Sequence, residues 1–290
     1  AEHLTHRQHW LIREVEGVIL RLGIPARIFA TLLMIFPGKI GDRMWRWWYQ
    51  RLAKAKAWGD FGFMNYGFID DDKPTLTPED EPDRLFIQLY HMNIRDIELS
   101  GKDVLEVGSG RGGGAHWIAR TYSPESLTGL DYSAAAVKLC SRMYGRQKNL
   151  KFIEGNAMKL PFEDNSFDVV YNVESSHCYS DMPAFIREAY RVLRPGGHFA
   201  WTDFRDESRM KAIRETFDET DFEILKDADI TAEVIAALDE ISDDKQARIE
   251  KGTGRIIRRS FETFAGVRGT PVYESFTKGE LRYYRYLLRK

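Results

Sequence analysis

The sequence is poor in cysteine: its 290 residues include only Cys140 and Cys178. Two cysteines do not make the disulfide framework of a small secreted domain, so we expect a reducing, cytoplasmic setting. An excess of charge of one sign is also lacking, because 42 basic and 44 acidic residues leave a net charge of −2. Without a basic field, no nucleic-acid partner is expected. No H-x-x-x-H, paired C-x-x-C or acidic triad at ligand spacing occurs, so we expect no metal site.

Long uninterrupted hydrophobic runs are absent as well. Residues 11–36 are mostly apolar, but charged side chains interrupt them, and the longest uncharged stretch, residues 28–38, is well short of the roughly 20 residues that span a membrane. Residues 43–51 (RMWRWWYQR) mix Trp with Arg, which suits a boundary between water and an apolar surface. We therefore expect residues 1–70 to form a helical extension and cap that packs on the domain or joins a homo-oligomer. Peripheral membrane contact is the alternative.

The remaining residues, 71–290, are expected to form one domain. An acidic, proline-bearing segment over residues 70–84 is typical of a loop that separates the extension from this core. A charged, mostly helical insertion is expected at about 207–264, with a strand at 221–225 inside it. The tail, residues 279–290, alternates like a strand and is expected to close one edge of a sheet.

Short apolar runs alternate with segments of helical periodicity in the middle of the chain. Ser133 is the expected N-cap of one of these helices, and Arg194–Gly197 (RPGG) is expected to turn the chain into the fifth strand. Strands and helices in alternation predict an α/β fold, a parallel sheet with helices on both faces. The expected strands are residues 103–107, 127–131, 150–155, 167–175 and 198–204.

A glycine-rich loop follows the first expected strand. The stretch Val104 to Ala115 reads VLEVGSGRGGGA and holds five glycines in its last eight residues. Such a turn between a strand and a helix is typical of a nucleotide-cofactor site, because glycine lets the backbone approach the ligand closely. Gly108, Gly110 and Gly113 also satisfy G-x-G-x-x-G, so NAD(P) and S-adenosylmethionine both remain open on this loop alone.

Two carboxylates near the loop favour S-adenosylmethionine. Asp131 ends the second strand, where it could accept hydrogen bonds from ribose hydroxyls, a need that both cofactors share. Glu106 ends the first strand, where it could reach a cationic amino-acid group, which NAD lacks. The plainer alternatives are that Asp131 only caps the next helix and that Glu106 is a structural ion-pair partner.

Further motifs carry a resemblance to a known family. The stretches EGNAMKLPFEDNSFDVVYN and VLRPGGHFA lie at the spacings seen in class I S-adenosylmethionine-dependent methyltransferases. Residues 100–205 resemble this family, in the branch that includes ubiquinone and sterol methyltransferases. Over about residues 61–205 and the tail, the chain is similar to mycobacterial phthiotriolone dimycocerosate and glycopeptidolipid methyltransferases, through FMNYGF, LYH, VLEVGSGRGGGA, TGLD, NVESSHCY and VLRPGG.

The resemblance implies a Rossmann-like sheet of seven strands, the last antiparallel, with S-adenosylmethionine over the carboxyl ends of strands one, two and four. Many relatives have Asp where this chain has Asn156, whose carbonyl can still accept from the adenine amino group. The implied cofactor-binding residues are Glu106, Gly108, Ser109 and Gly110 at the methionine part, Asp131 and Tyr132 at the ribose, Asn156 and Ala157 at the adenine, and Asn172 beneath the sulfonium.

The acceptor is expected to approach near NVESSHCY, after the fourth strand. His177 could deprotonate a hydroxyl, and Glu174 could orient His177 or act as the base itself; the alternative is that both are loop residues bonded to backbone. Cys178 is a weaker candidate. Aromatic residues around this point favour a greasy acceptor pocket, and we expect Tyr66, Tyr179 and Trp201 to contact the acceptor.

The sequence therefore predicts an S-adenosylmethionine-dependent methyltransferase that acts on a small, hydrophobic, lipid-like or natural-product acceptor. O-methylation of a hydroxyl is favoured because the resemblance points there. C-methylation of an isoprenoid double bond, through a carbocation that aromatic faces could stabilise, is the alternative within the class. A cofactor-binding scaffold protein and an NAD(P) oxidoreductase are the alternatives from other classes.

Overall fold

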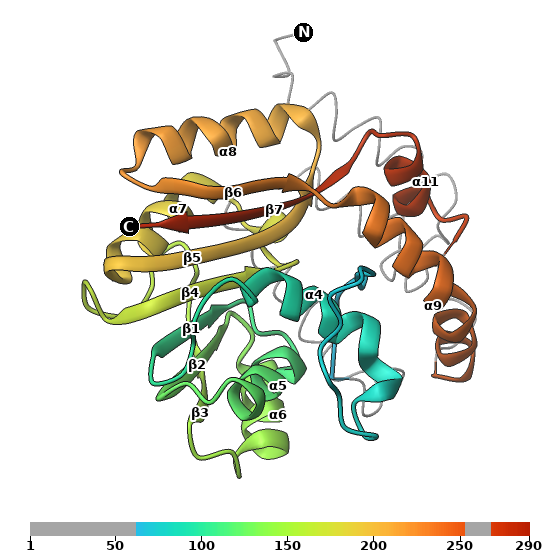
Figure 1. Ribbon diagram of the computed structural model, residues 1–290, viewed down its shortest axis with the longest axis horizontal. Helices are drawn as coiled ribbons and strands as arrows, with labels where there is room; N and C mark the ends of the chain where they lie inside the picture. The colour runs from blue at the N-terminus through green and yellow to red at the C-terminus, as the bar shows by residue number, and fades with distance from the viewer. Residues whose placement is uncertain (1–61, 253–267) are drawn as a thin grey trace, which may run out of the picture.

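A seven-stranded sheet forms the centre of the molecule (Figure 1). The computed structural model describes residues 62–252 and 268–290. The strand order is β3-β2-β1-β4-β5-β7-β6; neighbours from β3 to β5 run parallel, and β7 runs antiparallel to β5 and β6. The strands are β1 (Asp103–Val107), β2 (Ser126–Asp131), β3 (Leu150–Glu154), β4 (Phe167–Val173), β5 (Leu193–Arg205), β6 (Glu223–Asp229) and β7 (Arg282–Arg289).

Helices cover both faces of the sheet, as the alternation predicts (Figure 1). One hydrophobic core lies between the sheet and α4, α5, α9 and α11, and a second lies between the sheet and α7 and α8. β1 contributes Val104 to the first core and Leu105 and Val107 to the second, which explains why apolar residues occur on both of its faces. The helices are α4 (Arg84–Ile94), α5 (Gly113–Thr121), α6 (Ala134–Tyr144), α7 (Met182–Val192), α8 (Glu207–Glu219), α9 (Thr231–Gly252) and α11 (Pro271–Thr277), with 3-10 turns at Glu81–Asp83 and Ser176–Cys178.

Side-chain caps explain where two of the helices begin. Ser133 accepts a hydrogen bond from the Ala136 N–H and caps α6, as the sequence predicts. Asp181 accepts from the Ala184 N–H and caps α7 in the same way. A cap of this kind satisfies one backbone donor that the helix cannot, and it contributes about 1 kcal/mol.

The C-terminal strand does not close an edge of the sheet, so that expectation is wrong. β7 lies between β5 and β6, and β6 forms the edge. The middle six residues of β7 are all buried, whereas β6 is exposed along almost its whole length. A strand with aromatic and apolar side chains on both faces needs cover on both faces, and an interior position provides it. β6 also runs over Glu223–Asp229 rather than the predicted 221–225.

The turn predicted at Arg194–Gly197 lies inside β5, which begins at Leu193, and a register shift relative to β4 accommodates it. Arg194 connects the start of β5 to the two neighbouring strands β1 and β4. Its guanidinium bonds to Asp103 on β1 at 2.9 Å and to Asp168 on β4 at 2.7 Å. One side chain therefore ties together the starts of three neighbouring strands, at the end of the sheet away from the site described below.

Residues 1–61 of the predicted N-terminal extension lie outside the described residues, as does 253–264 of the predicted insertion. The expected subunit and membrane contacts therefore stay predictions. The structure does describe residues 62–68, here named the wall segment, which has no helix or strand. Within the described part of the chain, no helix has both the length and the apolar character needed to cross a membrane.

The packing of α7 on the sheet yields a test of the fold. Phe185 is fully buried between α7 and the sheet, so Phe185→Ala removes a large side chain and leaves a cavity. We expect the free energy of unfolding to fall by about 3–5 kcal/mol in urea denaturation. Arg187→Ala, at an exposed position of the same helix, is the control and should change it by less than about 0.5 kcal/mol. Equal effects of the two substitutions would contradict this packing.

Candidate functional site

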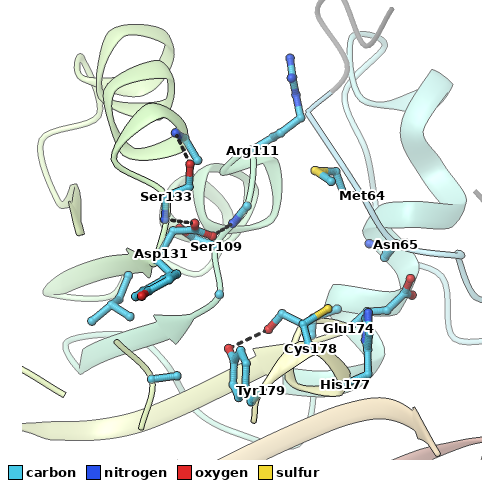
Figure 2. Close-up of a pocket in the computed structure, with 18 of the residues that line it drawn as sticks. Met64, Asn65, Ser109, Arg111, Asp131, Ser133, Glu174, His177, Cys178 and Tyr179 are labelled. Carbon is cyan, nitrogen blue, oxygen red and sulfur yellow. Dashed lines mark hydrogen bonds between the residues drawn. The ribbon is translucent and has the colours of Figure 1, made fainter. Parts of the chain in front are cut away.

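A pocket opens at the carboxyl ends of β1, β2, β3 and β4 (Figure 2). In an open parallel sheet, ligands bind where the strand order reverses, and here it reverses between β1 and β4. Loops after these strands form one side, and the wall segment forms another. Many of the residues that the sequence nominated line the pocket: Tyr66, Gly108, Ser109, Gly110, Asp131, Tyr132, Asn156, Ala157, Glu174, His177 and Tyr179.

Gly108 lets the loop that follows β4 pack closely against the glycine loop. Its φ is +82°, a conformation that favours glycine, and a Cβ built on it would lie 2.1 Å from Ser175 Oγ and 2.8 Å from the Tyr179 hydroxyl. A side chain here would therefore collide with the loop that follows β4. Ser109 comes next; its Oγ is buried and has no hydrogen-bond partner within the described part of the chain.

Gly113 and Gly114, later in the loop, allow other segments of the chain to pack closely against α5. The N–H of Gly113 donates to the Gly62 carbonyl at 3.0 Å, and a Cβ on Gly113 would lie 2.4 Å from that oxygen. A Cβ on Gly114 would lie 2.0 Å from the ring of Tyr90 on α4. These glycines let the wall segment and α4 come close to α5, so they build the opposite side of the pocket.

Asp131 holds the glycine loop through both carboxylate oxygens. Oδ2 accepts from the Gly110 N–H at 2.8 Å, and Oδ1 accepts from the Ser133 N–H at 2.8 Å. Burial raises the pKa of Asp131 to about 6, although these two N–H groups favour its charged form. The N-cap of α6 is Ser133, so Asp131 is not the cap of that helix. Tyr132 beside it is exposed, with 43% of its surface accessible.

Glu106 is buried behind the pocket rather than on its surface. Neither of its carboxylate oxygens has a hydrogen bond of standard geometry, and among the described residues it forms no ion pair. Burial raises the pKa of Glu106 to about 8. The hydroxyls of Tyr90 and Tyr171 face the carboxylate and lower its pKa, whereas the nearby charge of Asp131 raises it further. The structure thus gives no support to the ion-pair alternative for Glu106.

Asn156 and Asn172 occupy different positions. Asn156 lines the pocket after β3, and its side-chain oxygen accepts from the Met158 N–H at 3.0 Å. Asn172 is fully buried beneath the pocket floor, where Nδ2 donates to the Val107 carbonyl and to Ser175 Oγ, both at 2.7 Å. Asn172 therefore supports the loop after β4 instead of lining the cavity.

Glu174 lines the pocket just after β4 and adopts a φ of +44°, which is uncommon for a residue with a side chain. Its Oε2 accepts from the Tyr66 N–H and from the Tyr283 hydroxyl, each at 2.8 Å. Burial raises the pKa of Glu174 to about 7, despite these hydrogen bonds and the nearby charge of His177. The carboxylate thus ties β4, β7 and the wall segment together while it faces the cavity.

His177 is held by a buried carboxylate. Its Nδ1 lies 2.9 Å from Asp203 Oδ1, and its ring stacks on Phe204 at 4.5 Å between centroids. Burial disfavours the charged imidazolium, but Cys178 and Asp203 outweigh it and raise the pKa of His177 well above its ordinary value. The charges of Arg205 and His177 overcome the burial of Asp203 and hold its pKa well below the usual range.

The predicted contact between Trp201 and an acceptor is not supported by the structure. Trp201 is fully buried inside the second core, and its indole N–H donates to Ser176 Oγ at 2.8 Å. Ser176 in turn donates to Asp203 at 2.7 Å. A chain of hydrogen bonds therefore connects Trp201 to His177 through Ser176 and Asp203. Tyr66 and Tyr179 do line the pocket, and the ring of Tyr66 also stacks on Phe204 at 5.6 Å.

The residues fall into two groups on opposite sides of the pocket. Figure 2 shows Asp131, Ser109 and Ser133 together on one side and Glu174, His177 and Cys178 together on the other. Sequence reasoning missed Tyr90, Asp203 and Tyr283. Asp203 lies near the carboxyl end of β5, the position where parallel strands place functional side chains, and that rule could have found it. Within the described ranges, no group of three or more His, Cys, Asp or Glu side chains could hold a metal ion.

Comparison with known proteins identifies the kind of chain that builds such a pocket. Residues 105–201 match the family described as a methyltransferase domain. The chain is 38% identical over 250 residues to the phthiotriol/phenolphthiotriol dimycocerosates methyltransferase of Mycobacterium tuberculosis, which covers 86% of this chain and 92% of that protein. It is 32% identical over 255 residues to a fatty-acid O-methyltransferase of Mycolicibacterium smegmatis, which covers 87% of this chain and 92% of that protein.

A solved structure shares the fold. The geranyl diphosphate C-methyltransferase of Streptomyces coelicolor, solved with S-adenosyl-L-homocysteine, superposes with a TM-score of 0.59. The match covers 83% of this chain and 97% of that one, at 17% sequence identity. At this identity the likeness concerns the fold alone.

The isolation of Glu106 predicts how stability depends on pH. Its pKa is about 8 in the folded protein and 4.5 in an unfolded chain, so folding favours the protonated form. Glu106 therefore lowers the free energy of unfolding as pH rises from 4.5 to 8, by up to roughly 1.4 kcal/mol per pH unit. In urea denaturation, Glu106→Gln should lose this dependence, whereas Glu163→Gln at an exposed site should keep it. Parallel pH curves for wild type and Glu106→Gln would refute the assignment.

Proposed function

The chain belongs to the class I S-adenosylmethionine-dependent methyltransferases, and we propose that it moves a methyl group from S-adenosylmethionine to an oxygen atom of a small, hydrophobic, lipid-like acceptor. Two relatives are named for methyl transfer to lipids, dimycocerosates in one and fatty acids in the other. The observation that carries the proposal is the position of Glu174, a carboxylate with a pKa of about 7 that faces the pocket across from the glycine loop.

The pocket residues fit the proposed cofactor. Ser109 Oγ is a buried polar atom without a partner among the described residues, and a Cβ on Gly110 would meet only Met64 Sδ, at 3.9 Å, so the loop is open to the cavity there. We assign these two residues and Gly108 to the methionine part of the cofactor. When bound, S-adenosylmethionine supplies a methyl group on a sulfonium, which is already a good electrophile. The protein then has only to bind, orient and accept a proton.

The other end of the cofactor is assigned to the loops after β2 and β3. Asp131 is fixed by two backbone N–H groups, so its remaining lone pairs can accept from ribose hydroxyls. Tyr132 lies beside it, and we assign Asn156 and Ala157, which also line the pocket, to the adenine. The Asn156 oxygen already accepts from Met158, which leaves it one further lone pair for an amino group.

Glu174 is the group best suited to take a proton from the acceptor. Its Oε2 is occupied by Tyr66 and Tyr283, whereas its Oε1 has no hydrogen-bond partner within the described part of the chain. A base with a pKa near the working pH combines sufficient ionisation with sufficient basicity. Oε1 of Glu174 would therefore accept the proton of an acceptor hydroxyl as the methyl–oxygen bond forms and the methyl–sulfur bond breaks, with S-adenosylhomocysteine as the leaving group.

His177 has a supporting role in this scheme. Its raised pKa favours the charged form, and a charged imidazolium cannot remove a proton. Its positive charge lowers the pKa of Glu174 and so favours the ionised form of the base. The buried pair with Asp203 keeps that charge in place.

Apolar side chains on the pocket wall fit a hydrophobic acceptor. They come from the wall segment, from the loops after β3 and β4, and from the end of β4. The residues concerned are Met64, Tyr66, Met158, Val173 and Tyr179.

The proposed reaction can be tested by substitution of the base. Glu174→Gln keeps the shape of the side chain but cannot accept the proton, so kcat toward a long-chain alcohol should fall by about 10²–10⁴-fold. Affinity for S-adenosylhomocysteine, measured by calorimetry, should change little, because Glu174 lies across the pocket from the glycine loop. Glu163→Gln, at an exposed position, is the matched control. Product mass and NMR locate the methyl group; a methyl on carbon, or unchanged turnover in Glu174→Gln, would overturn the proposal.

The rate should also depend on pH in a defined direction. Because Glu174 acts as a base only when ionised and its pKa is about 7, kcat/KM should rise with pH through about 7 and then level off. In Glu174→Gln this rise should disappear from the residual rate. A wild-type profile that falls over the same range would show that the ionised carboxylate is not the active form.

A further inference from the structure

β7 brings the hydroxyl of Tyr283 to the pocket end of the sheet. Because β7 runs antiparallel to β5, it begins where the parallel strands end, and Tyr283, its second residue, lies opposite Phe204 near the end of β5. The side chain of Tyr283 is fully buried in the first core. A buried hydroxyl needs a hydrogen-bond partner there, because leaving it unpaired is costly.

Tyr283 is fixed through both its backbone and its ring. Its N–H donates to Thr231 Oγ1, and its carbonyl accepts from the Ile230 N–H, each at 2.8 Å, at the start of α9. Its ring packs against Phe204 and Phe276, with 6.1 and 6.3 Å between ring centroids. These contacts hold the hydroxyl in one place.

The partner of this hydroxyl is Glu174, 109 positions earlier in the chain. The Tyr283 hydroxyl donates to Oε2 of Glu174 at 2.8 Å, and the Tyr66 N–H donates to the same oxygen at 2.8 Å. The backbone of Glu174 is held as well, because its N–H donates to the Thr202 carbonyl on β5 at 2.9 Å. Since both donors occupy Oε2, Oε1 is left available to the cavity that Glu174 lines.

The ionised form of Glu174 depends on these donors. Burial raises the pKa of Glu174, and among the groups that lower it the Tyr283 hydroxyl has the largest effect, followed by the Tyr66 N–H and the charge of His177. The titratable groups around Glu174 are Tyr66 on the wall segment, Tyr90 on α4, His177 and Cys178 in the 3-10 turn after β4, Asp203 on β5 and Tyr283 on β7.

Tyr283 itself remains a donor at neutral pH. Burial raises its pKa well above the ordinary value of 10, and the nearby charges of Glu174 and Asp203 raise it further. The phenol therefore keeps its proton, whereas the carboxylate that it contacts, with a pKa of about 7, gains and loses one. A constant donor beside a titrating carboxylate favours the charged form of that carboxylate.

We propose that Tyr283 is a positioning residue for methyl transfer: its hydroxyl fixes Oε2 of Glu174, so that Oε1 is presented to the acceptor, and it favours the ionised base. This inference rests on the proposed function, namely that Glu174 takes the proton of an acceptor hydroxyl. Tyr283 does not line the pocket, so it acts through Glu174 and not on the acceptor itself.

The test is the pH profile of Tyr283→Phe, which removes the hydroxyl and keeps the ring. With a long-chain alcohol as acceptor, the midpoint of the rise in kcat/KM should move from about 7 to about one pH unit higher, because a hydrogen bond to the charged form is lost. At neutral pH kcat/KM should fall by about 5–10-fold, and most of this loss should be recovered at about pH 9. Affinity for S-adenosylhomocysteine should stay within about twofold of wild type.

Tyr284→Phe is the matched control. Tyr284 is the next residue of β7 and packs in the second core, and its hydroxyl donates to a different carboxylate, that of Glu207 on α8, at 3.1 Å. The substitution therefore removes the same kind of hydrogen bond from the opposite face of the same strand. It should leave both the midpoint and the rate unchanged.

A second variant changes the midpoint in the opposite direction. Replacement of Tyr283 by 3-fluorotyrosine makes the hydroxyl a stronger donor with little change of shape, so the midpoint should move below that of wild type. Carbon-13 NMR titration of the Glu174 carboxyl group in the ligand-free protein measures the same effects without turnover. The pKa of Glu174 should be higher in Tyr283→Phe and lower in the fluorinated protein than in wild type.

The outcomes separate this inference from the proposed function. If wild type transfers no methyl group to the alcohol, or if Glu174→Gln keeps full turnover, the proposed function fails. If wild-type kcat/KM rises through about pH 7 but Tyr283→Phe and the fluorinated protein keep the wild-type midpoint, the role of Tyr283 is overturned while the proposed function stands. A loss of stability in urea with an unchanged midpoint leads to the same conclusion, because it indicates a purely structural hydrogen bond.

Discussion

Three carboxylates lie where neighbouring parallel strands end, Glu106 fully buried and Asp131 and Glu174 half-buried, and desolvation of their charged forms shapes the chemistry of the pocket. Asp131 at the end of β2 receives two backbone N–H groups, Glu174 after β4 receives one N–H and one tyrosine hydroxyl, and Glu106 in β1 receives no hydrogen bond of standard geometry. Their pKa values rise in the same order, to about 6, 7 and 8. Hydrogen bonds to the charged form offset desolvation, so Asp131 and Glu174, with two donors each, ionise more easily than Glu106, which has none.

The three different pKa values suit the three carboxyl groups to different roles. Asp131 is the most easily ionised of the three and is already fixed, which suits an acceptor for ribose hydroxyls. Glu174 can exchange a proton near neutral pH, which suits a base. Glu106, with a pKa of about 8, remains mostly protonated at neutral pH. Asp203, a fourth buried carboxylate, is paired with Arg205 and His177 and remains ionised, so it serves to hold the imidazolium.

Much of the scaffold could be predicted from the sequence, because the signals are local. Alternating apolar runs predicted the five parallel strands, and the glycine loop with Asp131 predicted where the pocket lies. The position of β7 was predicted wrongly, since alternation marks a strand but does not name its neighbours. Tyr90 and Tyr283 were missed for a related reason: each reaches the pocket from an element distant in sequence, and no local pattern links Tyr283 to Glu174 across 109 positions. Trp201 was misplaced because strand alternation alone does not tell which face opens to a cavity.

The central claim, a graded set of carboxylates at the strand ends, is tested most directly by carbon-13 NMR titration of the side-chain carboxyl groups. We predict that Glu106 titrates highest, Glu174 next and Asp131 lowest, all above their ordinary values. Titration of all three groups near 4, with or without ligand, would contradict it.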